Sequence, residues 1–122
     1  MPKLNPYVAA LALVKKHSGT SGQTALAKCI LSIYNDEHYF SLGSILSPLD
    51  QTYTAVVLHM ITEYAAHGET QELRDAGLYV YQNFPGLVEM SIAMSEARSR
   101  VRQKWDDERE AENRRLYPEE YR

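Results

Sequence analysis

The feature that most constrains the fold of this chain is the pattern of its last thirty or so residues. From residue 87 onward, apolar side chains recur at alternating steps of three and four, the spacing of a narrow apolar seam along one helix. The seam consists of Leu87, Met90, Met94, Ala97 and Val101. A helix over residues 87–116 would be about 45 Å long, whereas a domain of about one hundred residues has a radius of gyration of about 13 Å. We therefore expect this helix to extend beyond the body it packs on.

The outer part of this helix changes character after Val101. Trp105 is the last large apolar member of the seam, and residues 106–115 hold five acids, three arginines, one alanine and one asparagine. A helical segment of mixed charge is typical of a solvated face and suits contact with another molecule better than catalysis. The sequence therefore predicts a helical body over residues 1–105 and a charged helical arm and tail over residues 106–122.

The rest of the chain predicts four more helices, joined by short loops. Asn5 and Pro6 begin the first, which runs to about residue 17. The others cover about 23–34, 48–67 and 70–84, where apolar residues recur at helical spacing. In the fourth of these, Ala76 and Gly77 leave the apolar face thin enough for close approach of a neighbouring helix. The expected fold is all-α: a five-helix, bundle-like single domain with a long, charged C-terminal helix.

Local signals set the expected helix boundaries. Ser47 is expected to be an N-cap with Pro48 at the first helical position, and Asp50 can reach back to the cap backbone as in a capping box. Residues 35–47 break the helical pattern and predict an irregular segment. Pro85 and Gly86 are expected to interrupt the chain before the last helix.

Composition and charge exclude several classes of protein. The single cysteine, Cys29, rules out an intrachain disulfide, and it lies on an apolar helix face where an inert buried thiol is expected. The chain shows no leader sequence and no apolar run approaching 18 residues, so we expect no membrane contact and a cytoplasmic location. Residues 1–97 hold five basic and nine acidic side chains, a net charge of -4, which suits docking onto a basic protein surface.

No group of residues predicts a catalytic or metal site. His59, Glu63 and His67 follow one another at steps of four, but this spacing spans about 12 Å, too far for one ion to reach both histidines. Closely spaced acids occur at helix starts or in the tail, where the helix dipole explains them. The loop serines lack a Gly-x-Ser-x-Gly context. The sequence therefore predicts a protein that is not an enzyme and binds no metal or cofactor.

Residues 25–75 carry a pattern of packing residues and one helix cap. It consists of Leu31-Ser32-Ile33-Tyr34-Asn35, then Phe40, Leu42 and Leu46, and finally Leu49-Asp50. In this pattern the chain resembles a family of small, uncharacterised helical bacterial proteins carried on plasmids and integrative elements. The family has no assigned activity, so the resemblance implies a context: an accessory protein of a mobile element. Such proteins often bind host or competitor machinery, and anti-CRISPR inhibitors are among them.

These observations favour a non-enzymatic protein-binding module from a bacterial mobile element. As an inhibitor of a host or defence complex, it would act by steric and acidic-surface occlusion. Its partner would be another protein, including a nucleic-acid-binding complex, or a second copy held along the seam of the last helix. The expected contact residues are Arg98, Arg102, Trp105, Asp106, Asp107 and Glu108. For Trp105 two interpretations remain open: it covers the end of the core, or it anchors the partner.

The alternative is a small DNA-binding regulator. Four basic side chains lie close together on the last helix, at Arg98, Arg100, Arg102 and Lys104. Nearby acids oppose a polyanion, and residues 98–122 carry eight basic and seven acidic side chains, without the basic excess of a general phosphate-backbone binder. We therefore expect nucleic acid to be the less favoured partner.

Overall fold

The computed structural model describes residues 5–36 and 38–121 and is helical throughout its regular parts. The elements in chain order are α1 (Pro6–Lys16), α2 (Ser21–Tyr34), α3 (Leu42–Leu46), α4 (Gln51–His67), α5 (Gln71–Asn83), α6 (Pro85–Leu116) and a 3₁₀ turn, η1 (Pro118–Tyr121). Because these ranges contain no strand, the prediction of an all-α domain is confirmed. The prediction of five helices was one short, since α3 forms within the segment expected to be irregular.

The core of the body is built around α2. This helix contacts α1, α3, α4 and α5, and six of its fourteen residues are buried. Leu26, Ile30 and Leu31 are completely buried in α2, where they meet Val14 of α1, Met60 of α4 and Val80 of α5 in one apolar cluster. A helix surrounded on several sides must be apolar over most of its circumference, which is why residues 25–31 are almost continuously apolar.

The approach of α2 to α5 depends on a missing side chain. Gly77 of α5 is buried, and a Cβ atom at this position would collide with the ring of Tyr34 in α2. Ala76 beside it is also completely buried. The predicted close approach at this thin helix face is confirmed, and α2 is the neighbour.

The helix caps explain where the sequence-based boundaries hold and where they fail. Asn5 caps α1 by accepting a hydrogen bond from the backbone N–H of Tyr7 at 2.9 Å, as expected. The prediction of Ser47 as the N-cap of the next long helix is wrong: Asp50 is the cap, accepting from the N–H of Tyr53 at 2.9 Å. Ser47 instead ends α3, because burial of Ile45 stabilises a separate helical turn before it.

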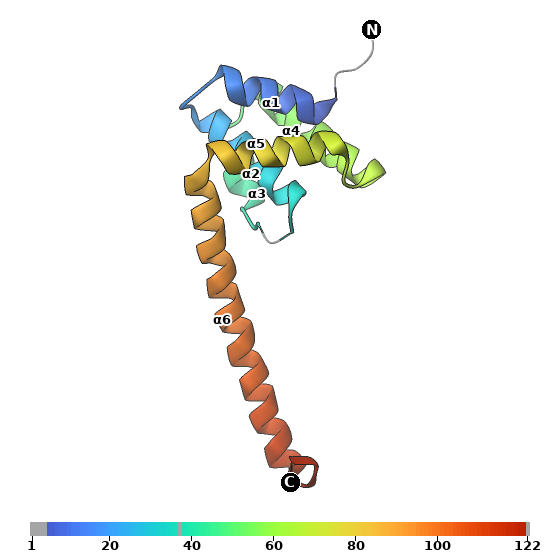
Figure 1. The fold of residues 1–122 in the computed structure, drawn as a ribbon, viewed down its shortest axis with the longest axis vertical. Helices are drawn as coiled ribbons and strands as arrows, with labels where there is room; N and C mark the ends of the chain where they lie inside the picture. The colour runs from blue at the N-terminus through green and yellow to red at the C-terminus, as the bar shows by residue number, and fades with distance from the viewer. Residues whose placement is uncertain (1–4, 37, 122) are drawn as a thin grey trace.

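The last helix, α6, projects away from the body. It has 32 residues and is therefore about 48 Å long, and Figure 1 shows most of it standing clear of the other helices. Pro85 occupies the first turn of α6, so the Pro85–Gly86 pair begins the helix closely after α5 without a separating loop. The predicted long C-terminal helix is confirmed.

Candidate functional site

The base of α6 is held by a buried histidine from the loop between α2 and α3. The His38 Nδ1 atom hydrogen-bonds the Ser91 hydroxyl of α6, and its Nε2 atom hydrogen-bonds the Tyr81 hydroxyl of α5. His38 is 7% exposed and Ser91 only 1% exposed. Because one side chain bonds to two helices in a water-poor place, it fixes the direction in which α6 leaves the body.

The last contact of α6 with the body is made by Arg98. Its guanidinium carbon lies 3.5 Å from the centre of the Tyr39 ring, in a cation–π contact. The same guanidinium lies 3.5 Å from the Ser95 hydroxyl. Arg98 was expected to contact a partner, but in the structure it is half-buried and packs on its own chain.

Beyond Arg98 the helix is uncovered. We name residues 99–116 the projecting segment: every one of these residues except Asn113 is exposed. Two large apolar side chains one helical turn apart remain in solvent there, with Val101 45% and Trp105 57% exposed. Trp105 therefore does not cover the core. Of the two interpretations left open by the sequence, the one that remains is an anchor for a partner.

The seam of α6 coincides only in part with its contact with the body: Leu87, the first residue of the seam, packs against the core. Ser91 is the only fully buried described residue of α6, and it lies outside the seam. Met90 and Ala97, which belong to the seam, are exposed. The apolar stripe therefore passes the edge of the body and continues along the projecting segment.

Side chains along the outer half of the projecting segment pair with one another. The nitrogen-to-oxygen distances are 3.2 Å for Arg109–Asp106, 3.9 Å for Lys104–Glu108, 3.7 Å for Arg114–Glu110 and 2.5 Å for Arg115–Glu112. The Asp107 carboxylate accepts a hydrogen bond from Gln103 at 2.9 Å. Exposed pairs at this spacing each stabilise a helix slightly, so they support the helix where the body does not.

Two basic residues nearer to the body differ, because they lack such partners. Within residues 5–36 and 38–121, neither Arg100 nor Arg102 has an ion pair. Both side chains are exposed. The projecting segment thus offers unpaired positive charge beside Val101 and Trp105.

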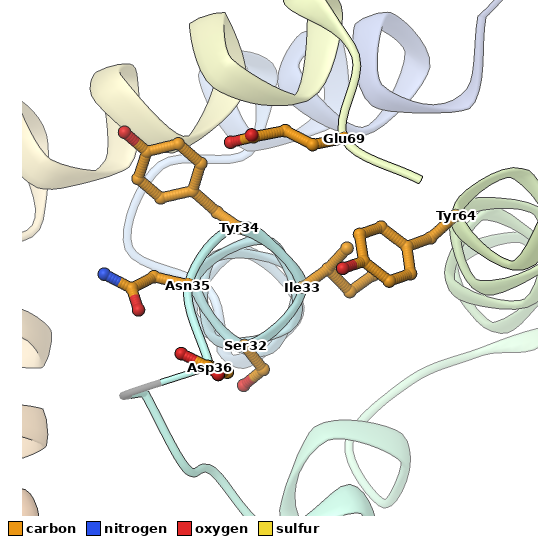
Figure 2. Close-up of a pocket in the computed structure, with 7 residues that line it drawn as sticks. All are labelled: Ser32, Ile33, Tyr34, Asn35, Asp36, Tyr64 and Glu69. Atoms are coloured by element: carbon orange, nitrogen blue, oxygen red, sulfur yellow. The ribbon is translucent and has the colours of Figure 1, made fainter. Parts of the chain in front are cut away.

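A depression on the body offers no comparable site. This hollow of about 490 Å³ surrounds the C-terminal end of α2 and is lined by Ser32, Ile33, Tyr34, Asn35, Asp36, Tyr64 and Glu69. In Figure 2 the pocket residues lie around the end of α2, with Tyr34 and Glu69 of the α4–α5 loop on one side, and Ser32 and Asp36 on the other. The two carboxylates therefore do not converge on a common point where a substrate could react.

Two buried titratable groups of the body, Cys29 and Tyr7, are held in their neutral forms. Burial raises the pKa of the Cys29 thiol to about 12, so it is a poor nucleophile at neutral pH. Burial also raises the pKa of the Tyr7 phenol to about 12, with a smaller contribution from the negative charge of Glu63. Across the part of the chain that the structure describes, no three His, Cys, Asp or Glu side chains gather to hold a metal ion.

Comparisons with known proteins found no relative of this chain. No protein-family model, curated protein or solved structure matches the chain. The resemblance to small proteins of plasmids and integrative elements therefore stays a prediction. Among the described residues, no helix combines the length and apolar character needed to cross a bilayer.

Sequence reasoning selected the projecting segment but missed its anchor. The periodic seam and the charged run located Trp105 and the acids that follow it. His38 carried no such signal, because it lies in an irregular stretch and its partners are 43 and 53 residues away in sequence. Only the folded chain brings the loop, α5 and α6 together.

Proposed function

We propose that this protein is a non-enzymatic protein-binding module that engages its partner through the projecting segment of α6. The observation that carries this proposal is the exposure of Trp105, 57%, on a helix that its own body leaves uncovered. Tryptophan is among the residues that contribute most to binding at protein interfaces, where a partner buries it together with neighbouring apolar groups. Val101, 45% exposed one turn earlier, supplies such a neighbour.

The more specific part of the proposal is inhibition of a host or defence complex. The resemblance to mobile-element proteins supports it, as does the net charge of -4 over residues 1–97. An acidic body held beside a basic surface would compete with nucleic acid for that surface and block it sterically. The cytoplasmic location expected from the sequence belongs to the same proposal.

Capture from the source cell with matched variants tests the proposal. Trp105→Ala should reduce the amount of specifically retained protein by about tenfold or more, because it removes the central apolar contact. Leu78→Ala is the control, since Leu78 is 54% exposed on α5 and lies outside the projecting segment. Deletion of 106–122 should also abolish capture while leaving the melting temperature of the body nearly unchanged. Equal capture by all three variants and the parent chain would contradict the proposal.

A second candidate function, a small DNA-binding regulator, is favoured by one observation. Arg100 and Arg102 are exposed and lack ion pairs within the described residues, so they are available to phosphate. This function predicts duplex binding that weakens steeply with salt and is lost in Arg100→Ala with Arg102→Ala. Binding to duplex DNA that these two substitutions leave unchanged would exclude the basic patch as its source.

A further inference from the structure

We propose that the projecting segment binds a second copy of the same chain, with the two α6 helices antiparallel and crossing near Trp105. This inference rests on the proposed function in taking the segment as a protein-binding surface, and it names the occupant of that surface. Three features of the molecule support this arrangement: the order of charge along α6, the positions of its exposed apolar residues and the position of the body at one end of it.

Charge along α6 is divided at Trp105. We name residues 98–104 the basic half, which has four basic side chains and no acid. Residues 106–112 are the acidic half, which has five acids and one arginine. Their net charges are therefore +4 and -4. Equal and opposite charge in two adjacent segments of seven residues makes the helix complementary to itself.

This complementarity is satisfied in only one of the two helix orientations. An antiparallel pair centred on Trp105 places the basic half of each copy beside the acidic half of the other. A parallel pair in register places like charge beside like charge in both halves, which is destabilising. Two-fold symmetric association uses the same patch on both copies, so one helix supplies both halves of the complementary surface.

The apolar residues follow the same symmetry. Trp105 lies at the centre, where it would contact Trp105 of the second copy, and Val101 flanks it on both sides of the crossing. Met94 and Leu116 are each eleven residues from Trp105, so antiparallel pairing brings Leu116 of one copy beside Met94 of the other. Leu116 is 50% exposed in the single chain. The paired helices would overlap over residues 94–116, about 33 Å.

The shape of the molecule also favours the antiparallel arrangement. The body occupies one end of α6, and at the other end the described residues form the short η1 turn (Figure 1). An antiparallel pair places the two bodies at opposite ends of a shared rod, whereas a parallel pair brings both bodies to the same end. The dimer would thus carry two acidic bodies that stay exposed for a further partner.

Sedimentation equilibrium of the full chain is the first test. The parent chain should reach a mass of twice 13.9 kDa as its concentration rises. Reversing the basic half with Arg100→Glu, Arg102→Glu and Lys104→Glu should weaken the dimer by roughly tenfold or more, because the segment becomes acidic throughout.

The mirror-image variant completes the test. Asp106→Lys, Glu108→Lys and Glu110→Lys reverse the acidic half at the positions symmetric about Trp105, and should weaken the dimer similarly. All six substitutions in one chain should restore dimerisation, because complementarity returns with the signs exchanged. Glu72→Lys with Glu89→Lys is the control: it changes two exposed acids outside both halves and should leave the dimer intact. Far-ultraviolet circular dichroism verifies that each variant keeps its helix content.

The outcomes separate this inference from the proposed function. A parent chain that stays monomeric at every concentration overturns the dimer, and so does a dimer that neither reversal weakens. If the chain is monomeric but Trp105→Ala still reduces the capture of another protein, the proposed function stands and only the inference of a second copy is wrong. If the chain is monomeric and capture is indifferent to Trp105, both fail.

Discussion

The body and the projecting segment are both helical, yet different forces hold them. In the body, α2 buries six of its fourteen residues against its neighbours. In α6, one residue of 32 is buried, and residues 99–116 rely on exposed ion pairs one turn apart. Such pairs stabilise a helix only slightly. The length of α6 is therefore not explained by what it contributes to the core. Its exposed apolar residues are explained if a partner covers them.

The largest expected contrast is between two apolar truncations, one in each region. Leu26→Ala removes a completely buried side chain of α2 and should cost about 2–5 kcal/mol in free energy of unfolding. Val101→Ala removes a 45% exposed side chain of the projecting segment and should change that free energy by less than about 0.5 kcal/mol in dilute protein. Urea unfolding followed by circular dichroism measures both. Similar costs for the two variants would mean that the segment packs on the body.

Alkaline pH should also act on the body rather than on the projecting segment. The pKa of Cys29 is raised by burial from 9.0 to about 12, and that of Tyr7 from 10.0 to about 12. The unfolded chain therefore loses these protons first, so the free energy of unfolding is highest below about pH 9 and falls as pH rises towards 12. Urea unfolding at stepwise pH measures the decline. Cys29→Ala should make it shallower, and an unchanged slope would show that the thiol is not held neutral.

The junction between the two regions depends on His38. His38→Ala leaves the buried Ser91 hydroxyl without this partner and should cost about 1–3 kcal/mol. Hydrogen exchange should accelerate in the first turns of α6 before it changes in α2, because His38 joins α6 to the body. Tyr39→Ala is the comparison: it removes only the cation–π contact with Arg98 and should cost about 0.5–1 kcal/mol. Uniform acceleration across α2 and α6 would contradict a local role for His38.

A small effect is also expected for a buried hydroxyl of the body. The Tyr7 Oη atom is buried and has no hydrogen-bond partner in the described part of the chain. Tyr7→Phe removes a desolvated polar group and keeps the ring, so stability should stay equal or rise by up to about 1 kcal/mol. Thermal unfolding of the two proteins side by side measures the difference. A clear loss of stability would show that the hydroxyl is bonded in solution.

The sequence predicted those elements whose signal is local and periodic. The ranges of α1, α5 and α6 and the end of α4 followed from apolar spacing and from local signals such as the cap at Asn5. The five-residue α3 was missed because so short a helix shows no apolar period. Without α3, Ser47 was predicted as the N-cap of the next helix, although Asp50 is the cap. His38 was missed because its bonds to Tyr81 and Ser91 exist only once distant segments meet.

The candidate site was predictable in part for the same reason. The spacing of apolar residues shows a seam that extends beyond the body, so the sequence already indicated Trp105 as a candidate contact residue. The half-burial of Arg98 was not, since the ring of Tyr39 that it covers belongs to the irregular loop after α2. A basic side chain on a helix gives no sign of whether an aromatic ring from elsewhere will meet it.

The fluorescence of Trp105 at increasing protein concentration shows whether this side chain is exposed to solvent or covered by a second copy, because the chain has one tryptophan and its emission reports one site. The account predicts the emission of a solvated indole in dilute protein, with a shift to shorter wavelength as a second copy covers it. Short-wavelength emission at dilutions where sedimentation finds only the monomer would show that the chain's own body buries Trp105, and would contradict an exposed projecting segment.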